Sequence, residues 1–94
     1  MKKIDNEILD LLRCPVTGSK LEYAQNELVE LINRRSGAGQ LVDRSGQKID
    51  FQIDAGLVNA DSSLLMPIRG GVVSMAAGRS IEVANVNNQE TETQ

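Results

Sequence analysis

One cysteine carries most of the chemistry that this sequence offers. Cys14 is the single thiol among 94 residues, and Thr17 stands where a Cys-x-x-Cys motif would place a second one. A catalytic thiolate needs a base, most often histidine, and the chain contains no histidine. A structural zinc site needs about four nitrogen or sulfur ligands. We therefore expect Cys14 to be a small buried hydrophobic residue, with no metal or cofactor bound by a single chain.

Other catalytic patterns are also absent. The glycines at 37–39 and 70–71 lack the strand-loop-helix setting and the Lys-Ser/Thr ending of a phosphate loop. Asp50 and Asp54 share one face of an alternating segment, but their spacing is too wide for an intimate acid–base pair. We therefore expect that the protein is not an enzyme.

Composition narrows the class of protein. The hydrophobic fraction is 40% and the aromatic residues are Tyr23 and Phe51, which predicts one small domain with an aliphatic core. A net charge of -3 with scattered basic residues argues against direct nucleic-acid binding. No run approaches the ~20 apolar residues of a membrane span. A single thiol suits a reducing compartment, so we expect a cytoplasmic protein.

The first half of the chain predicts two helices around a short strand. Asp5 is a suitable N-cap for a helix that ends before Pro15. A second helix is expected from Asn26, as its N-cap, to about Ser36, and Gly37 would be its C-cap. Residues 21–23 between them favour a strand. The spacing of the first helix predicts one buried apolar face, made of Ile4, Ile8, Leu11 and Leu12.

The second half predicts a small antiparallel sheet. Apolar and polar residues alternate over 47–54, which indicates a hairpin over 40–54 with Ile49, Phe51 and Ile53 on its inner side. Further strands are expected at 56–58, 64–68 and 72–75. Pro67 cannot donate a ladder hydrogen bond, so it should lie at an edge or a strand end. Either 64–68 or 72–75 could accept a partner strand.

These elements predict an α+β domain, with two helices on a small antiparallel sheet. One domain is expected over residues 1–84. Residues 85–94 are polar and acidic and are expected to form a disordered tail.

Two blocks of the chain resemble a known family. Residues 8–21 contain a helical pattern that leads into Cys-Pro-Val-Thr, and residues 56–77 contain Met-Pro-Ile-Arg-Gly-Gly-Val. Together they resemble the Trm-one-twelve-like family of small zinc-knuckle proteins, in which a second knuckle precedes a Tyr-Pro-Ile segment. Residues 24–55 would then be a helix-hairpin insertion relative to the short bacterial members.

The resemblance implies a rubredoxin-like or zinc-ribbon-like core with two knuckles. Its ligand positions would fall on Cys14, Thr17, Asn59 and Ser62. Only the first of these is a usual zinc ligand, so the resemblance implies knuckles without metal. Short polar side chains can hold such turns by hydrogen bonds to the backbone.

The resemblance also implies a function. Members of this family activate and stabilise methyltransferases that act on the translation machinery, without an active site of their own, by adding a strand to the enzyme's sheet. This implies a non-catalytic protein-binding module with a methyltransferase partner. Two alternatives stay open: a structural protein that forms a homodimer or larger oligomer through the same edge strand, and a small enzyme. The implied partner contacts are Pro67, Ile68, Val72, Val73 and Met75.

Overall fold

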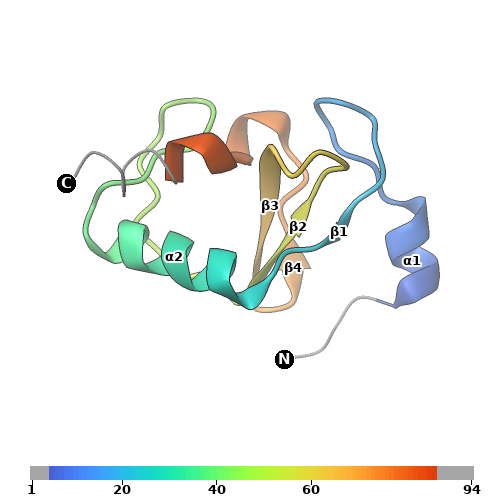
Figure 1. Ribbon diagram of the computed structural model, residues 1–94, viewed down its shortest axis with the longest axis horizontal. Coiled ribbons are helices and arrows are strands. Elements are labelled where there is room, and N and C mark those ends of the chain that lie inside the picture. Colours follow the sequence, from blue (N-terminus) through green and yellow to red (C-terminus); the bar gives the residue numbers. More distant parts are fainter. Residues whose placement is uncertain (1–4, 87–94) are drawn as a thin grey trace.

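The computed structural model describes residues 5–86 and contains an antiparallel sheet flanked by helices (Figure 1). The strand order is β1-β2-β3-β4, and β5 pairs with β3 beside β4. The predicted α+β class with an antiparallel sheet is confirmed. The elements are α1 (Asn6–Leu11), β1 (Glu22–Tyr23), α2 (Asn26–Gly37), β2 (Ala55–Val58), β3 (Leu64–Arg69), β4 (Val72–Val73), the 3-10 turn η1 (Ala77–Arg79) and β5 (Ile81–Glu82).

The central strand is β3, so the prediction that 64–68 forms an edge is wrong. On one side it pairs with β2, and on the other it pairs first with β5 and then with β4. Pro67 lies within this strand rather than at its end. Its carbonyl accepts the Ser74 N–H at 2.9 Å, on the side of β3 that faces β4 and β5. The nitrogen of a strand residue faces the same side as its carbonyl, so the nitrogen of Pro67 also points away from β2. The missing N–H of Pro67 therefore costs no hydrogen bond to β2.

A two-residue turn joins β3 to β4. Gly70 and Gly71 have φ values of 56° and 81°, and a pair of positive φ values is the signature of a type I′ turn. The turn matches the twist of the flanking strands and fixes Val72 opposite Arg69. The Gly-Gly pair thus sets the register of β4.

The helix α2 begins at Asn26, one residue earlier than predicted. Gln25 is the N-cap, Asn26 is already helical, and Ala38 rather than Gly37 is the C-cap. The helix packs on one face of the sheet, where Gly56 is in close contact with Leu65: a Cβ at residue 56 would lie 2.7 Å from the leucine side chain. The α2-side core consists of Val29, Leu31, Ile32, Leu41, Ile49, Ile53, Val58, Leu65, Ile81 and Val86.

The hairpin predicted over 40–54 is confirmed in its first part and is wrong beyond residue 49. Val42 and Lys48 form an antiparallel bridge, and the N–H groups of Asp43 and Ile49 donate to the carbonyls of Gln47 and Leu41, each at 2.9 Å. The structure has no regular strand between α2 and β2. The backbone of 49–53 bonds to side chains of α2 instead: Ser36 Oγ donates to the Ile49 carbonyl at 3.1 Å, and Asn33 Oδ1 accepts the Ile53 N–H at 2.8 Å. The predicted alternation survives, because Ile49 and Ile53 are buried while the polar residues between them are exposed.

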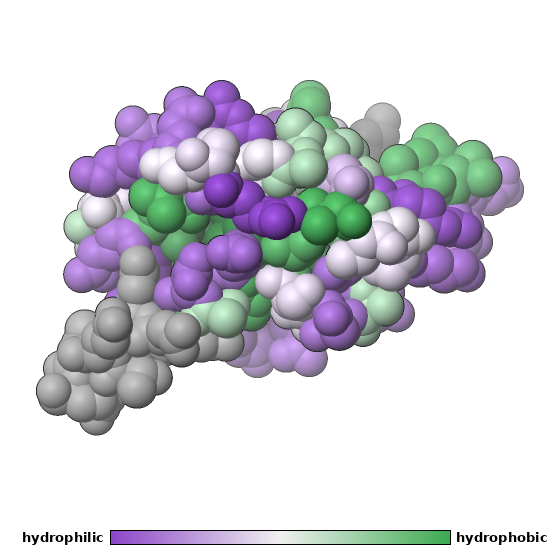
Figure 2. All heavy atoms as spheres, turned by 90° about the horizontal axis from the view of Figure 1, so that it is seen from above, coloured by the Kyte–Doolittle hydropathy of each residue, from purple (hydrophilic) through white to green (hydrophobic). Residues whose placement is uncertain are grey.

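The helix α1 lies at the far end of the molecule and is capped as predicted, with Asp5 Oδ1 accepting the Glu7 N–H at 3.1 Å. Its predicted buried face is wrong for Ile8 and Leu11, whereas Leu12 is half-buried. Ile8 and Leu11 are 54% and 80% exposed, and Figure 2 shows hydrophobic residues gathered at this end. Ile4 lies outside the described residues. The helix turns Leu9 and Leu12 toward the α1-side core, which consists of Cys14, Leu21, Leu57, Leu64, Met66 and Ile68.

The domain extends beyond its predicted boundary at residue 84. Residues 83–86 are helical, and Val86 is fully buried in the α2-side core. Asn85 therefore belongs to the folded part, whereas the rest of the predicted tail, 87–94, lies outside the described residues. Within 5–86, no helix has the length and apolarity needed to cross a membrane.

Candidate functional site

The first turn singled out by the sequence closes on Cys14. The Cys14 N–H donates to the Ser19 carbonyl at 2.8 Å, and the Gly18 N–H donates to the Cys14 carbonyl at 2.9 Å. The sulfur accepts the Thr17 N–H at 3.5 Å. Cys14 is buried, as predicted, within the α1-side core. Burial raises the pKa of its thiol, but hydrogen bonds from Thr17, Val16 and Gly18 oppose this effect and hold the pKa below its ordinary value.

The second turn is organised by a buried amide. Asn59 Oδ1 accepts the N–H groups of Ser63 at 2.9 Å and Leu64 at 3.1 Å, and its Nδ2 donates to Ser63 Oγ at 3.1 Å. Ser62 contributes through its backbone, since its N–H donates to the Asn59 carbonyl at 2.9 Å and its φ is 58°. The hydroxyl role expected of Ser62 is therefore filled by Ser63.

The two turns lie side by side, and we call them the paired turns (residues 14–19 and 59–64). Ser19 Oγ accepts the Ala60 N–H at 3.1 Å and lies 3.0 Å from Thr17 Oγ1. A cavity of about 130 Å³ lies between the turns and is lined by Thr17, Ser19, Asn59, Ala60 and Asp61.

This arrangement does not suit zinc. The polar groups between the turns are hydroxyls and an amide that already bond to one another, rather than thiolates or imidazoles. Across residues 5–86, no group of three or more His, Cys, Asp or Glu side chains could hold a metal ion.

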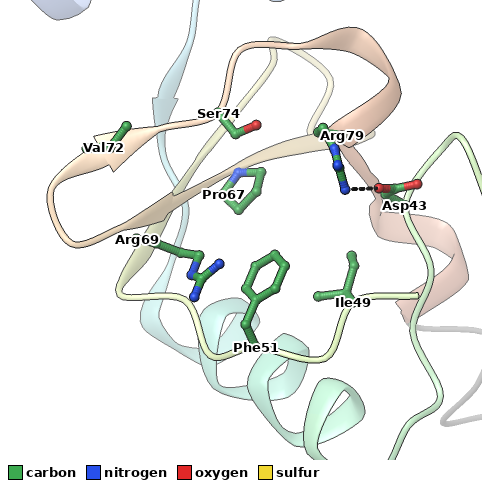
Figure 3. A pocket seen from close by; sticks show the side chains of 8 residues that line it. All are labelled: Asp43, Ile49, Phe51, Pro67, Arg69, Val72, Ser74 and Arg79. Carbon is green, nitrogen blue, oxygen red and sulfur yellow. Dashed lines mark ion pairs between the residues drawn. The ribbon is translucent and has the colours of Figure 1, made fainter. Parts of the chain in front are cut away.

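A larger cavity lies on the opposite side of β3 from the α1-side core, and we call it the arginine pocket (Figure 3). Its volume is about 410 Å³, within the range of small-ligand sites. It opens between the β3–β4 hairpin and the irregular segment after α2. It is lined by Asp43, Ile49, Phe51, Pro67, Arg69, Val72, Ser74 and Arg79.

Both arginines of the pocket are held by specific partners. The Arg69 guanidinium lies 4.0 Å from the centroid of the Phe51 ring, which is a cation–π geometry. Arg79 Nη1 lies 3.5 Å from Asp43 Oδ2. The Arg79 side chain is half exposed, whereas the Asp43 side chain is almost fully buried. The pocket thus has one cation on an aromatic face and one beside a buried carboxylate.

Asp43 organises its own loop as well as Arg79. Its Oδ1 accepts the Ser45 N–H at 2.9 Å, the Gln47 N–H at 3.1 Å and the Ser45 hydroxyl. Burial raises the pKa of the Asp43 carboxyl, but these hydrogen bonds and the nearby Arg79 cation outweigh it and leave the pKa below its ordinary value. Asp43 is therefore a fixed anion at the edge of the arginine pocket.

The structure divides the implied partner contacts into surface and core. Val72 is 72% exposed. Val73 and Met75 are half-buried and pack on the α1-side core. Pro67 and Ile68 are buried, and Ile68 is only 2% exposed, so neither is a surface contact in this conformation. Both residues are buried because β3 is the central strand of the sheet, whereas the sequence predicted an edge strand.

The exposed member of this set lies on an open strand edge. Among the described strands β4 pairs only with β3. Ser74 donates its N–H to β3, so alternation turns the N–H and C=O groups of Val73 away from the sheet. The β4 edge therefore offers backbone groups for a further strand, with Val72 beside them.

Sequence reasoning missed Asp43, Arg69 and Arg79. The Asp-Arg-Ser-Gly stretch at 43–46 signals a turn, which the structure contains. Nothing in the sequence pairs that aspartate with Arg79 or places Arg69 over Phe51, since both contacts arise from tertiary packing.

Comparison with known proteins supports the fold alone. No protein-family model matches the sequence, and no curated protein matches it. The fold is similar to the solution NMR structure of XF2673 from Xylella fastidiosa, with a TM-score of 0.70 and 19% sequence identity. The similarity covers 90% of this chain and 88% of that chain.

Proposed function

We propose that this chain is a non-catalytic protein-binding module whose partner is a methyltransferase acting on the translation machinery. The β4 edge is its contact, and it extends the partner's sheet by one strand pairing. The observation that carries this proposal is the open edge at Val73 next to the exposed Val72. The partner class rests on the sequence resemblance of the two blocks that contain the paired turns.

We further propose that the paired turns are knuckles that no longer use a metal. Their contact through Ser19 and Ala60 supports this reading, because two segments far apart in the sequence meet where a shared metal would otherwise join them. Hydrogen bonds of Asn59 take over the task of fixing the turn. Elemental analysis of the purified protein should find less than one tenth of an equivalent of zinc. Stoichiometric zinc that survives dialysis against a chelator would contradict this part of the proposal.

Affinity capture from the native lysate, with mass spectrometry, tests the partner. The tagged wild-type chain should enrich a methyltransferase stoichiometrically. Val72→Asp should abolish the capture, because a buried charge at the strand contact would lack a partner. Val16→Asp is the matched control, since Val16 is also an exposed valine but lies in the first turn. It should capture as well as the wild type.

Two results would contradict the proposal. One is recovery of the bait alone at near-physiological salt. The other is equal loss of capture in both variants, which would separate binding from the β4 edge. Circular dichroism of each variant checks that the fold is retained.

A second candidate function is self-association through α1. The observation that favours it is the exposed apolar pair Ile8 and Leu11, one helical turn apart at the end of the molecule. Light scattering of the isolated chain should then give a dimer mass that Leu11→Gln returns to the monomer. A monomer mass for the wild type would remove this candidate.

A further inference from the structure

The arginine pocket has an apolar body with a cationic entrance. Ile49 and Pro67 are buried and form its floor, and the exposed Val72 stands at its rim. Phe51 comes from the irregular segment and faces the β3–β4 hairpin across the cavity (Figure 3). An aromatic ring of a ligand would contact these apolar side chains on several sides and would lose its contact with water there.

The charges of the pocket lining do not balance. Arg69 and Arg79 contribute two positive charges and Asp43 contributes one negative charge, so one positive charge is left over. Among the described residues, the ion pair between Arg79 and Asp43 accounts for that carboxylate, and Arg69 has only its contact with the Phe51 ring. A guanidinium stacked by its face keeps its N–H groups free at its edge, where they can donate to a carboxylate.

We propose that the arginine pocket binds a monocarboxylate that carries an aromatic ring. The carboxylate accepts hydrogen bonds from Arg69 and from the outward N–H groups of Arg79, and the ring lies on the apolar floor. A single negative charge matches the single excess cation. A doubly charged phosphate would bring a second charge close to the fixed carboxylate of Asp43. This site goes beyond the partner proposed above and does not depend on it.

The ring and the arginines act together in this arrangement. Phe51 holds the Arg69 guanidinium in place, so that less side-chain freedom is lost when the ligand binds. Asp43 does the same for Arg79. Ser74 adds a hydroxyl to the lining beside Val72. Both cations are thus positioned before the ligand arrives.

A titration of the full-length chain followed by amide NMR shifts tests this site. The probe is 3-phenylpropionate, with three controls: its neutral amide, propionate without the ring, and inorganic phosphate. We expect saturable shifts confined to residues 43–51 and 67–79. Each control should bind at least tenfold more weakly than the probe.

A substitution measures the contribution of Arg69 to binding. Arg69→Gln should weaken binding at least tenfold, because it removes the uncompensated cation. Arg34→Gln is the matched control, an exposed arginine on α2, and should leave the dissociation constant unchanged. Equal binding of acid and amide, tighter binding of phosphate, or an unchanged affinity in Arg69→Gln would each overturn the proposal. So would the absence of saturable shifts at these residues.

A further titration with a peptide distinguishes two sources of an aromatic carboxylate, a free small acid and the carboxyl end of a polypeptide. Gly-Gly-Phe with a free carboxylate is compared with its C-terminal amide. Binding of 3-phenylpropionate alone identifies a free small acid as the ligand. Binding of the peptide acid with equal or higher affinity, lost in the peptide amide, identifies the carboxyl end of an aromatic-terminated polypeptide.

Discussion

The paired turns and the arginine pocket lie in one small domain but use polar groups in opposite ways. In the paired turns, Asn59 and Ser19 direct their polar atoms at the backbone and at neighbouring hydroxyls. In the arginine pocket, Arg69 and Arg79 are positioned by partners yet keep donors that no described side chain uses fully. The polar groups of the paired turns therefore bond to one another, whereas the arginines of the pocket keep N–H groups available to a ligand.

This contrast separates a structural role from a binding role. A buried polar group that is fully hydrogen-bonded stabilises its turn, and its loss leaves orphaned partners behind. A cation at the rim of a cavity contributes little to folding, since it is solvated in the free protein. Substitutions of the buried polar groups, Asn59 in the paired turns and Asp43 at the edge of the arginine pocket, should therefore change stability, whereas those of the two pocket arginines should change binding.

Asn59→Ala is expected to have the largest effect on stability. It leaves the buried Leu64 N–H without its acceptor, and the Ser63 N–H keeps only Asp61 Oδ1, which should cost about 2–3 kcal/mol of unfolding free energy. Urea denaturation measures the change. Asn26→Ala, at an exposed helical position, is the control and should stay within about 0.5 kcal/mol. A loss below about 1 kcal/mol for Asn59→Ala would mean that the turn does not depend on this amide.

Asp43→Asn is expected to have a smaller, pH-dependent effect. The variant keeps an acceptor but loses the charge, which should cost about 1–2 kcal/mol at pH 7. The pKa of Asp43 is lowered in the folded state relative to about 3.9 in the unfolded chain. Its charged form thus stabilises the fold fully above about pH 5. This contribution disappears as the pH falls through the lowered folded-state pKa.

Denaturation of both proteins at pH 7 and at pH 3 checks the sign. The gap between wild type and Asp43→Asn should narrow on acidification. A gap that is constant, or that widens in acid, would show that the carboxylate of Asp43 is not the stabilising species.

Cys14→Ala should cost about 1 kcal/mol, since it removes one buried sulfur from the α1-side core. In the wild type, the thiol should react with an alkylating reagent far more slowly under native conditions than in 6 M guanidinium. Mass spectrometry of the labelled chain gives both rates. Equal rates would show that the first turn opens readily.

Arg69→Gln should have the smallest effect on stability, within about 0.5 kcal/mol, because its side chain lies at an exposed strand end. The same variant is the one expected to lose aromatic carboxylate binding. A destabilisation above about 1.5 kcal/mol would show that the contact between Arg69 and Phe51 stabilises the fold. It would contradict the assignment of a binding role, rather than a structural role, to the arginine pocket.

Much of the fold follows from local signals. The Asp5 cap, the second helix, the Gly-Gly turn and the inward set Ile49, Phe51 and Ile53 are visible as capping, turn and alternation patterns. The hairpin predicted over 40–54 was too long, because side chains of α2, rather than a second strand, bond to the backbone beyond its short first part. The buried face of α1 was also predicted wrongly. A helix of six residues can present more than one apolar face, and only its packing against the sheet decides which face is buried.

The candidate site was harder to predict than the fold. The sequence marked both segments of the paired turns, although Ser63 rather than Ser62 supplies the hydroxyl. Of the partner contacts that it implied, Val72 is exposed but Ile68 is buried, because apolar strand residues do not reveal which strand is central. The arginine pocket was missed, since its members come from four separate segments that only tertiary packing brings together.

Amide hydrogen exchange, measured on the chain alone and in its captured complex, tests most directly whether the partner binds at the β4 edge and leaves the paired turns free. We predict slower exchange in the complex at residues 72–75, at the β4 edge, and unchanged exchange at 14–19 and 59–64 in the paired turns. Protection of the paired turns, with no change at residues 72–75, would contradict this account and would assign binding to the turns.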